Sequence, residues 1–311
     1  MIVDCFTYMN EREVLLARLE YLKDTVDLFV IVEADMTFQG EPRELDFPKV
    51  RPDVMLPESQ IRYVVVNGLP VDRGAWECER KVRDAILDGL TQIDEDALIL
   101  IGDVDEIINR DRLITLASEV VDPVALKLRY FTYKVDWEWM APWTKPRALR
   151  RRDLVSPDAL RRERNLPVID NAGWHLSWLG GEIRVRNKIE AFSHTEIRDL
   201  LRSPQHLRTC LALGVDMLGR GVLQHVKSAE AFPGFPRASH PTLWAPARTS
   251  QELARARIYN FAIPGLRWLH FPTNPLMFAV GALLSIPIRS ATHLRRLLGA
   301  ARGAVRQGLR G

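Results

Sequence analysis

The chain has 311 residues, of which 47% are hydrophobic and 27% are charged, a composition typical of a globular protein with one large domain or two small ones. Its three cysteines lie far apart, which excludes a disulfide framework and a cysteine-based metal motif and favours a reducing compartment. We find no secretory leader and no run of 18 apolar residues, so we expect a cytoplasmic protein without a membrane-spanning segment.

The net charge of +3 is unevenly distributed along the chain. Residues 253–311 contain nine arginines and no lysine or acid, which leaves a charge of −6 for residues 1–252. With the apolar stretch 276–288, this segment resembles a helix that lies on an anionic membrane, at the inner face of the cell membrane. The alternative is a helical hairpin packed on the domain. No nucleic-acid recognition motif accompanies the charge, so we expect no nucleic acid as a partner.

The first 66 residues alternate between strand and helix patterns. Residues 1–9 are apolar enough for a strand, and residues 11–23 have the apolar spacing of a helix, with Asn10 and Glu13 as a capping box. The apolar runs 28–32 and 61–66 suit strands that are buried on both faces. Together these segments predict a βαβ unit.

The alternation continues with a helix at 75–90 and a strand at 97–101, which predicts an α/β fold with a mainly parallel central sheet and helices on both faces. After this point a long strand is expected at 124–135, whereas the basic stretch 145–164 resembles an exposed loop. We therefore expect one domain over residues 1–245 and a helical, basic, partly apolar C-terminal extension over residues 246–311.

The strongest functional signal follows the apolar run 97–101. Gly102, which we expect to permit a tight turn, leads into three carboxylates at Asp103, Asp105 and Glu106. Acids are costly at the mouth of a hydrophobic strand unless a cation meets them, and α/β sheets bind ligands at the carboxyl ends of their strands. An Asp-x-Asp pair suits Mn²⁺ or Mg²⁺ that also holds a diphosphate. This pattern predicts a metal-dependent glycosyltransferase that uses a nucleotide sugar.

The carboxylates have different predicted roles. Asp105 is the preferred metal ligand, and Asp103 is either a second ligand or a ribose contact. Glu106 either takes part in the function or holds the turn or a nearby arginine. His175 and His194 either complete the metal shell, touch phosphate, or are structural.

Further candidates for donor binding lie at strand ends and on one helix. Glu33 ends the second strand, where an acid contacts a ribose in doubly wound folds; the alternative is a capping or surface acid. Arg80 and Arg83 face either a phosphate or solvent. Five tryptophans between residues 137 and 178 suit sugar stacking or core packing. The donor-binding candidates are Thr7, Asn10, Glu11, Glu33, Arg80, Arg83, Asp103 and Trp174.

Several of these segments together resemble glycosyltransferase family 17, the group of the β-1,4-mannosyl-glycoprotein N-acetylglucosaminyltransferase. The matching stretches are Asp4-Cys-Phe with Asn10-Glu11, residues 26–33 with Thr37-Phe38-Gln-Gly40, Asp103-Val-Asp-Glu106, Gly173-Trp174-His175 and residues 191–196. The resemblance implies a GT-A-like nucleotide-sugar-binding fold, a divalent metal and an inverting transfer, with UDP-N-acetylglucosamine as the expected donor.

An inverting transfer needs a base for the acceptor hydroxyl, usually a carboxylate. The candidates are Asp170, Glu182 and Glu190, with Asp170 preferred because it precedes the glycine-tryptophan-histidine turn. The acceptor is expected to be a saccharide or a lipid-linked saccharide. Two alternative functions are a sugar nucleotidyltransferase, which the absence of glycine from residues 7–12 disfavours, and a catalytically dead, membrane-associated saccharide-binding protein, which the intact aspartate pair disfavours.

Overall fold

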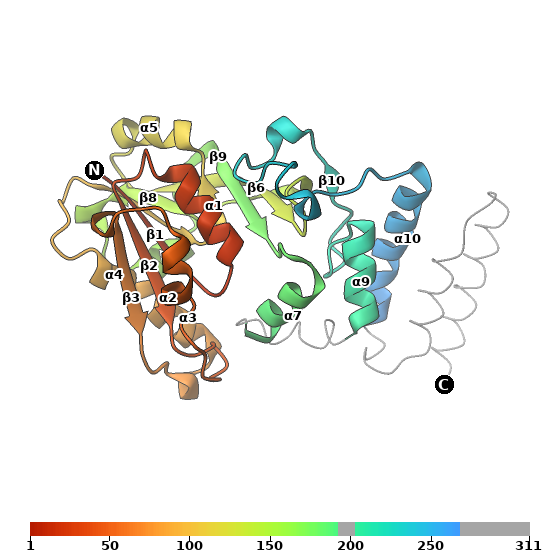
Figure 1. Cartoon of the computed structure of the whole chain (residues 1–311), viewed down its shortest axis with the longest axis horizontal. Helices are drawn as coiled ribbons and strands as arrows, with labels where there is room; N and C mark the ends of the chain where they lie inside the picture. The colour runs from red at the N-terminus through yellow and green to blue at the C-terminus, as the bar shows by residue number, and fades with distance from the viewer. Residues whose placement is uncertain (192–202, 268–311) are drawn as a thin grey trace. The chain divides into compact units, whose positions relative to one another are not determined.

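The protein is described by a computed structural model that covers residues 1–191 and 203–267. The described chain divides into two compact units, which we treat separately (Figure 1). The first unit contains residues 1–180, 190–191 and 224–245, and the second contains residues 181–189, 203–223 and 246–267. The second unit therefore includes residues 181–189 and 203–223, which precede the domain boundary at residue 245 that the sequence predicts.

The first unit is built on a sheet in which ten strands of the described residues take part. The strands are β1 (Ile2–Thr7), β2 (Leu28–Ala34), β3 (Ile61–Val66), β4 (Leu98–Asp103), β5 (Glu106–Ile108), β6 (Val124–Thr132), β7 (Trp137–Trp143), β8 (Arg147–Arg150), β9 (Val168–Ser177) and β10 (Gln224–His225). The helices of this unit are α1 (Arg12–Leu22), α2 (Phe47–Val50), α3 (Ala75–Asp84), α4 (Ile86–Gly89), α5 (Arg110–Glu119) and α6 (Pro157–Arg162).

The sheet has a parallel and a largely antiparallel half. The strand order is β10-β7-β6-β8-β4-β1-β2-β3, with β9 beside β6 and β5. Strands β4, β1, β2 and β3 are parallel, whereas β8, β6, β7 and β10 pair antiparallel and β9 runs parallel to β6. The α/β class is confirmed, and the parallel half agrees with a GT-A-like fold. The antiparallel half was not anticipated from the sequence.

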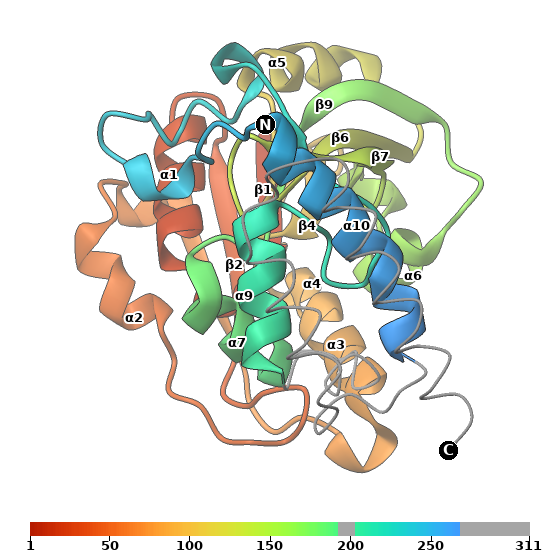
Figure 2. The same ribbon diagram turned by 90° about the vertical axis from the view of Figure 1, so that its right-hand side faces the viewer.

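Helices cover both faces of the parallel half, as predicted. Alternate residues of a strand point to opposite faces, so Phe6 and Phe29 pack with α1, while Cys5 and Val30 pack with α3 and α4. Figure 2 shows α1 on one side of β1 and β2 and α3 on the other. The continuous apolar runs of these strands follow from burial on both faces.

The capping box predicted at Asn10 is wrong. Helix α1 begins at Arg12 with Glu11 at its N-cap, and no side chain caps it. Asn10 has a left-handed backbone with φ of 67°, which asparagine tolerates, and its side-chain oxygen accepts a hydrogen bond from Arg43. The side chain is therefore occupied elsewhere.

The exposed loop predicted at 145–164 is also wrong, because this stretch contains β8 and α6. Ser156 caps α6 by accepting a hydrogen bond from the amide of Ala159, and Pro157 stands in the first turn. Arg147 and Arg161 are buried although the stretch is rich in charge. Pairing with polar groups makes that burial possible.

The second unit is helical where it is described. Its helices are α7 (Gly181–Ala191), α9 (Pro204–Leu213) and α10 (Ser250–Arg267). Buried His206 on α9 links the helices, since its Nδ1 lies 2.8 Å from the hydroxyl of Tyr259 on α10 and its Nε2 lies 2.9 Å from the carbonyl oxygen of Met217. Among the described helices none is long and apolar enough to cross a membrane. The helical prediction for the extension holds over α10, and the apolar stretch 276–288 lies outside the described residues.

Candidate active site

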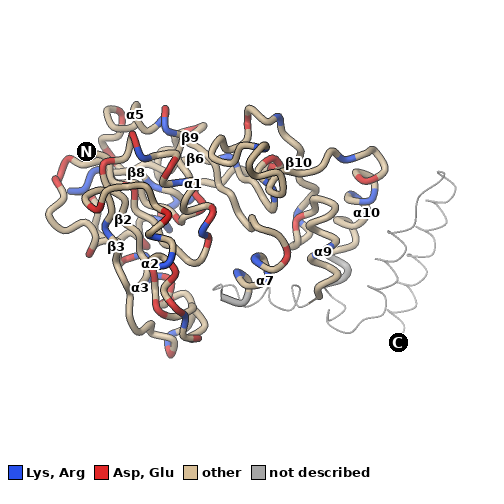
Figure 3. Tube along the Cα trace, in the orientation of Figure 1, with Lys and Arg blue, Asp and Glu red and all other residues tan. Residues whose placement is uncertain are grey.

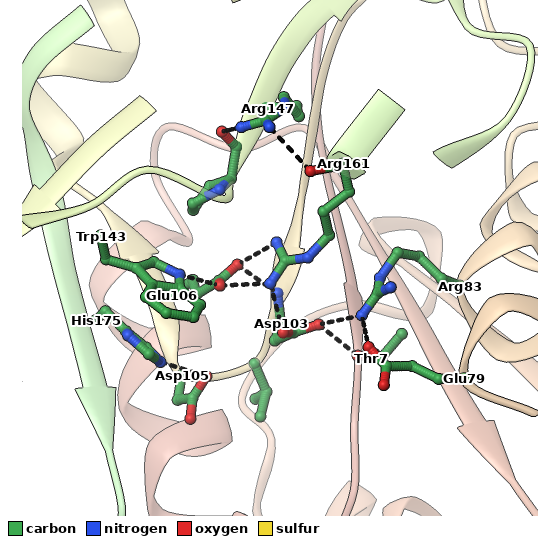
Figure 4. A network of polar contacts seen from close by, with 12 residues as sticks. Thr7, Glu79, Arg83, Asp103, Asp105, Glu106, Trp143, Arg147, Arg161 and His175 are labelled. Carbon is green, nitrogen blue, oxygen red and sulfur yellow. Dashed lines mark hydrogen bonds and ion pairs between the residues drawn. The ribbon is translucent and has the colours of Figure 1, made fainter. Parts of the chain in front are cut away.

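The predicted carboxylates lie where two central strands end. Strand β4 ends at Asp103, beside Thr7 at the end of β1, and the Thr7 hydroxyl donates a 3.0 Å hydrogen bond to Asp103 Oδ1. A short turn then leads into β5, which begins at Glu106. Figure 4 shows the side chains of Asp103, Asp105 and Glu106 in one network. The site therefore lies at the carboxyl ends of β1 and β4.

A buried arginine from α1 fixes the backbone of this turn. Arg18 forms a two-bond ion pair with Asp4 at 2.6 and 2.8 Å. Its Nη1 also donates to the carbonyl oxygens of Asp103, Val104 and Glu106 at 2.8, 3.1 and 2.9 Å. The carboxylates that follow β4 are thus held in place before any ligand binds, which is the preorganisation that a binding site needs.

Glu106 has both structural roles that the sequence offered as alternatives, since it holds the turn and also binds an arginine. Its buried carboxylate accepts hydrogen bonds from the Asp103 amide at 2.8 Å, from the Trp143 indole and from Arg161. The predicted tight turn at Gly102 is wrong, since Gly102 lies within β4. A Cβ at this position would lie 2.9 Å from Glu106 Oε2, so glycine provides room for the carboxylate.

Two buried arginines compensate the acids. Arg161 Nη2 lies 2.5 Å from Asp103 Oδ2, and the same guanidinium binds both oxygens of Glu106 (Figure 4). Arg83 Nη2 lies 3.6 Å from Asp103 Oδ1, and Arg83 also binds Asp158 and Glu79.

These ion pairs fix the charges of the network. Burial alone would raise the pKa of Asp103, but Arg161 and Arg83 more than offset it and lower that pKa. Burial alone would lower the pKa of Arg161, but Asp103 and Glu106 raise it. Asp103 and Arg161 are therefore both charged at neutral pH.

Of the two candidate arginines on α3, the structure brings only Arg83 to the site. Arg80 is exposed and binds Glu77 of its own helix at 2.5 Å. Arg83 is buried, and its Nη2 approaches Asp103 Oδ1, the same oxygen that accepts the hydrogen bond from Thr7 (Figure 4).

Asp105 and His175 form a second pair beside this network. Both side chains are buried, and His175 Nε2 lies 3.5 Å from Asp105 Oδ1. The imidazole packs against both Tyr130 and Trp143, with ring centroids 4.6 and 4.4 Å away. Its Nδ1 has no hydrogen-bond partner among the described residues. The ring is therefore held rigidly with one nitrogen toward the carboxylate.

These residues fit a divalent ion that a substrate helps to hold. No three His, Cys, Asp or Glu side chains of the described chain converge as a complete metal site. Mg²⁺, however, is commonly bound by one or two carboxylates together with substrate phosphates. The four carboxylates of Asp103, Glu106, Glu79 and Asp158 outnumber the three guanidinium groups of Arg83, Arg161 and Arg162 that bind them, and Asp105 adds a further negative charge nearby. The excess negative charge favours a cation beside Asp105.

Glu33 is occupied by the protein itself. The buried carboxylate accepts hydrogen bonds from Arg43 Nη2 and the Asp46 amide at 2.8 Å, from the Phe47 amide at 3.0 Å and from the Tyr63 hydroxyl at 2.8 Å. It thereby holds the start of α2 against β2. This arrangement favours a structural role over a ribose contact.

Three further donor candidates bind or pack against other parts of the first unit. Asn10 binds Arg43, and the Glu11 carboxylate accepts a hydrogen bond from the Met9 amide. Trp174 lies on the opposite face of β9 from His175, where it packs against Tyr21 and Phe232. Among the tryptophans of residues 137–178, it is Trp143 that contacts Glu106.

Of the three predicted bases, Asp170 lies in the same unit as the carboxylates and away from them. Asp170 lies five residues before His175 on β9, with its side chain 65% exposed and bound to Lys127. Glu182 belongs to the second unit, where it binds Arg208 at 2.7 Å. The Glu190 side chain and the whole of His194 lie outside the described residues.

Two arginines that organise the site, Arg18 and Arg161, were not predicted from the sequence. Arg161 stands on α6, and a serine N-cap followed by proline at Ser156-Pro157 was an available helix signal. Arg147 fixes the end of that helix by donating to the carbonyl oxygens of Leu160, Arg161 and other residues nearby at 2.7–3.1 Å. Burial and the nearby Arg161 lower the pKa of Arg147 to about 10. No local pattern marked either interaction.

The chain matches a known protein family over more than half of its length. The family described as glycosyltransferase family 17 matches residues 1–220. Among solved structures, the chain is similar to the galactosyltransferase LgtC in complex with donor and acceptor sugar analogues, with 12% sequence identity and a TM-score of 0.28. This match covers 52% of the present chain and 60% of LgtC, so less than two thirds of LgtC is spanned. No curated protein matches the chain.

Proposed function

We propose that this chain, which belongs to glycosyltransferase family 17 and is therefore a glycosyltransferase, is a metal-dependent inverting enzyme. It transfers a sugar from a nucleotide donor, UDP-N-acetylglucosamine, to a saccharide or lipid-linked saccharide acceptor. The observation that carries the proposal is the preorganised carboxylate turn after β4, with Asp105 beside His175.

The residues of the site have separable roles in this proposal. Asp105 and His175 hold a Mn²⁺ or Mg²⁺ ion, with Asp103 as a further ligand or a ribose contact. When bound, the ion stabilises the negative charge of the departing diphosphate as a Lewis acid. Arg18 keeps the turn in place, so that Asp105 does not have to move when the donor arrives. Thr7 orients Asp103 through its hydrogen bond.

Thermal shift measurements across a panel of nucleotide sugars, with and without Mn²⁺, test the donor and the metal together. A ligand at about 100 times its dissociation constant stabilises the folded state by about 2.7 kcal/mol. We expect the largest shift with UDP-N-acetylglucosamine and Mn²⁺, no shift in Asp105→Asn, and a normal shift in Asp111→Asn. Asp111 is a matched control because its side chain is 87% exposed.

Two results would contradict this proposal. If no nucleotide sugar shifts the wild-type protein, the chain is not a nucleotide-sugar enzyme of this kind. If Asp105→Asn keeps the full manganese-dependent shift, the ion is held elsewhere.

We also propose that the basic C-terminal extension lies on an anionic membrane, on the cytoplasmic side. The last acidic residue of the chain is Glu252, at the start of α10 (Figure 3), and only arginines carry charge after it. On α10 the side chain of Phe261 is 87% exposed. The cysteines of the described chain are all free, which supports a reducing compartment.

Liposome flotation tests this placement. Each arginine near an anionic surface adds about 1 kcal/mol of attraction, which weakens as salt rises. We expect the full chain to float with phosphatidylserine vesicles at low salt and a truncation after residue 272 to float less. Equal recovery of both forms with neutral and anionic vesicles would show that the extension does not bind membranes.

A further inference from the structure

A buried carboxylate holds a half-exposed histidine in the first unit, away from the residues discussed so far. Asp136, in the turn between β6 and β7, is 1% exposed, and its Oδ2 lies 2.6 Å from His225 Nε2. Its Oδ1 accepts a hydrogen bond from the Ala245 amide at 2.8 Å. The side chain of His225 on β10 is 38% exposed. One ring nitrogen is thus fixed by a carboxylate, in a side chain that solvent reaches.

Strand pairing places His225 on the face of the sheet that carries His175. His225 lies opposite Trp137, Trp139 lies opposite Tyr130, and Tyr130 lies opposite His175. Directly paired residues share a face of the sheet, as do alternate residues of one strand.

The separation of the two histidines suits a donor between them. Three strand spacings and two residues along β7 put His225 roughly 16 Å from His175 between Cα atoms. The diphosphate belongs beside Asp105 and His175, and the donor sugar and the attacking hydroxyl extend beyond it. A base for that hydroxyl therefore has to stand at a distance from the metal pair.

We propose that the Asp136–His225 pair is the general base of the transfer, an inference that rests on the glycosyltransferase activity proposed above. His225 Nδ1 removes the proton of the acceptor hydroxyl while the hydroxyl oxygen forms a bond to the anomeric carbon. The bond between that carbon and the diphosphate oxygen breaks, and its electron pair leaves with the diphosphate. Asp136 holds the imidazole in the required tautomer and stabilises the imidazolium, as a carboxylate does in other His-dependent sites.

A purely structural role explains the pair less well. The segment 224–245 is already fastened beside β7 by backbone hydrogen bonds from Val226 to Asp136 and from Val135 to Leu243, both of 3.0 Å. Lys134 Nζ adds a 2.6 Å bond to the carbonyl oxygen of Thr242. Because the His225 side chain is 38% exposed, its contact with the buried Asp136 adds little to a connection that these bonds already hold.

The test compares His225→Gln, Asp136→Asn and the control His240→Gln. His240 lies in the same segment, where its Nδ1 is 3.1 Å from the Ser239 hydroxyl and its ring packs edge-on against Phe235. The donor is the nucleotide sugar that stabilises the wild type most, with Mn²⁺, and the acceptors are p-nitrophenyl mannosides and glucosides. Because general base catalysis contributes about 10²–10⁴-fold, kcat of His225→Gln should fall at least about 100-fold, and His240→Gln should keep the wild-type kcat.

Rescue by a small molecule separates a base from a structural residue. In His225→Ala, added imidazole should restore part of kcat in proportion to its concentration. Imidazole would not restore kcat if His225 only held segment 224–245 in place. The proposal is overturned if His225→Gln keeps kcat within twofold of the wild type. It is also overturned if His225→Ala loses activity and thermal stability together and imidazole has no effect.

Donor binding, measured by thermal shift in each variant, distinguishes this proposal from the function on which it rests. Normal donor binding with lost transfer in His225→Gln supports the base. Normal donor binding with normal transfer overturns the base and leaves the proposed function intact. If the wild type binds no nucleotide sugar, both are overturned.

Discussion

Replacing Arg161 by methionine probes the charge balance at the centre of the site. The substitution removes the guanidinium that binds Asp103 and both oxygens of Glu106, and it keeps most of the side-chain volume. The Glu106 side chain is fully buried and that of Arg161 is 6% exposed, so water cannot replace the lost contacts. The variant leaves a buried carboxylate without its ionic partner.

The size of the effect follows from that burial. Removing one partner of a buried ion pair costs about 3–5 kcal/mol of folding free energy. The double variant Arg161→Met with Glu106→Gln removes both charges and keeps an amide beside the Asp103 amide and Trp143. We expect it to regain about 2–3 kcal/mol of that loss, the upper range of coupling between contacting residues.

Urea denaturation followed by tryptophan fluorescence measures these free energies of unfolding, since Trp143 contacts Glu106 directly. The control is Arg162→Met on the same helix, where the arginine side chain is 65% exposed. We expect a loss of less than about 1 kcal/mol for this control. The reasoning is refuted if Arg161→Met costs no more than the control, or if the double variant is no more stable than Arg161→Met.

Three further predictions follow from single side chains. Asp105→Asn should lower donor turnover by a factor on the order of 100, because charge stabilisation by a metal ion is worth several kcal/mol; unchanged turnover in EDTA would contradict it. Burial lowers the pKa of His206 in the folded protein, so folding favours the neutral ring. The stability that the neutral ring contributes is complete above the unfolded-state pKa of about 6.5 and is lost as the pH falls below that value. The difference in melting temperature between wild type and His206→Gln should therefore shrink from pH 7.5 to pH 5, and a constant difference would argue against burial of a neutral ring. Glu33→Gln should lower the free energy of unfolding by about 2 kcal/mol in urea denaturation. The substitution replaces one carboxylate oxygen by an amide NH2, which cannot accept the hydrogen bonds that Arg43 and the Asp46 amide donate there. A loss below 0.5 kcal/mol, roughly the least expected for one hydrogen bond, would exclude the structural role.

Much of the parallel half of the fold could be predicted from the sequence. The strands at Leu28, Ile61 and Leu98 begin within one residue of the predicted positions. For β2 and β4 the reason is that a strand buried on both faces is a continuous apolar run. Turn and cap signals were less reliable. Asn10 and Gly102 suited the expected cap and turn, yet the structure uses one to bind Arg43 and the other to make room for Glu106.

The candidate site was also predicted only in part. The sequence indicated Asp103, Asp105 and His175, since carboxylates directly after a buried strand need a partner. It placed Asp170 among them, although Asp170 instead binds Lys127 at the surface, because order along the chain does not tell which end of a strand a residue occupies.

By itself, the sequence determined the α/β class, the family and the acidic turn after β4, because apolar periodicity and motif spacing are local properties of the chain. Only the tertiary structure decided which cations meet those acids. Arg18 and Arg161 are 88 and 55 residues away from Glu106 along the chain, and both come from positions where an exposed arginine is the usual expectation. Burying an arginine is favourable only where carboxylates and carbonyl oxygens converge on it, and that convergence exists only once the sheet has brought β1, β4 and α6 together.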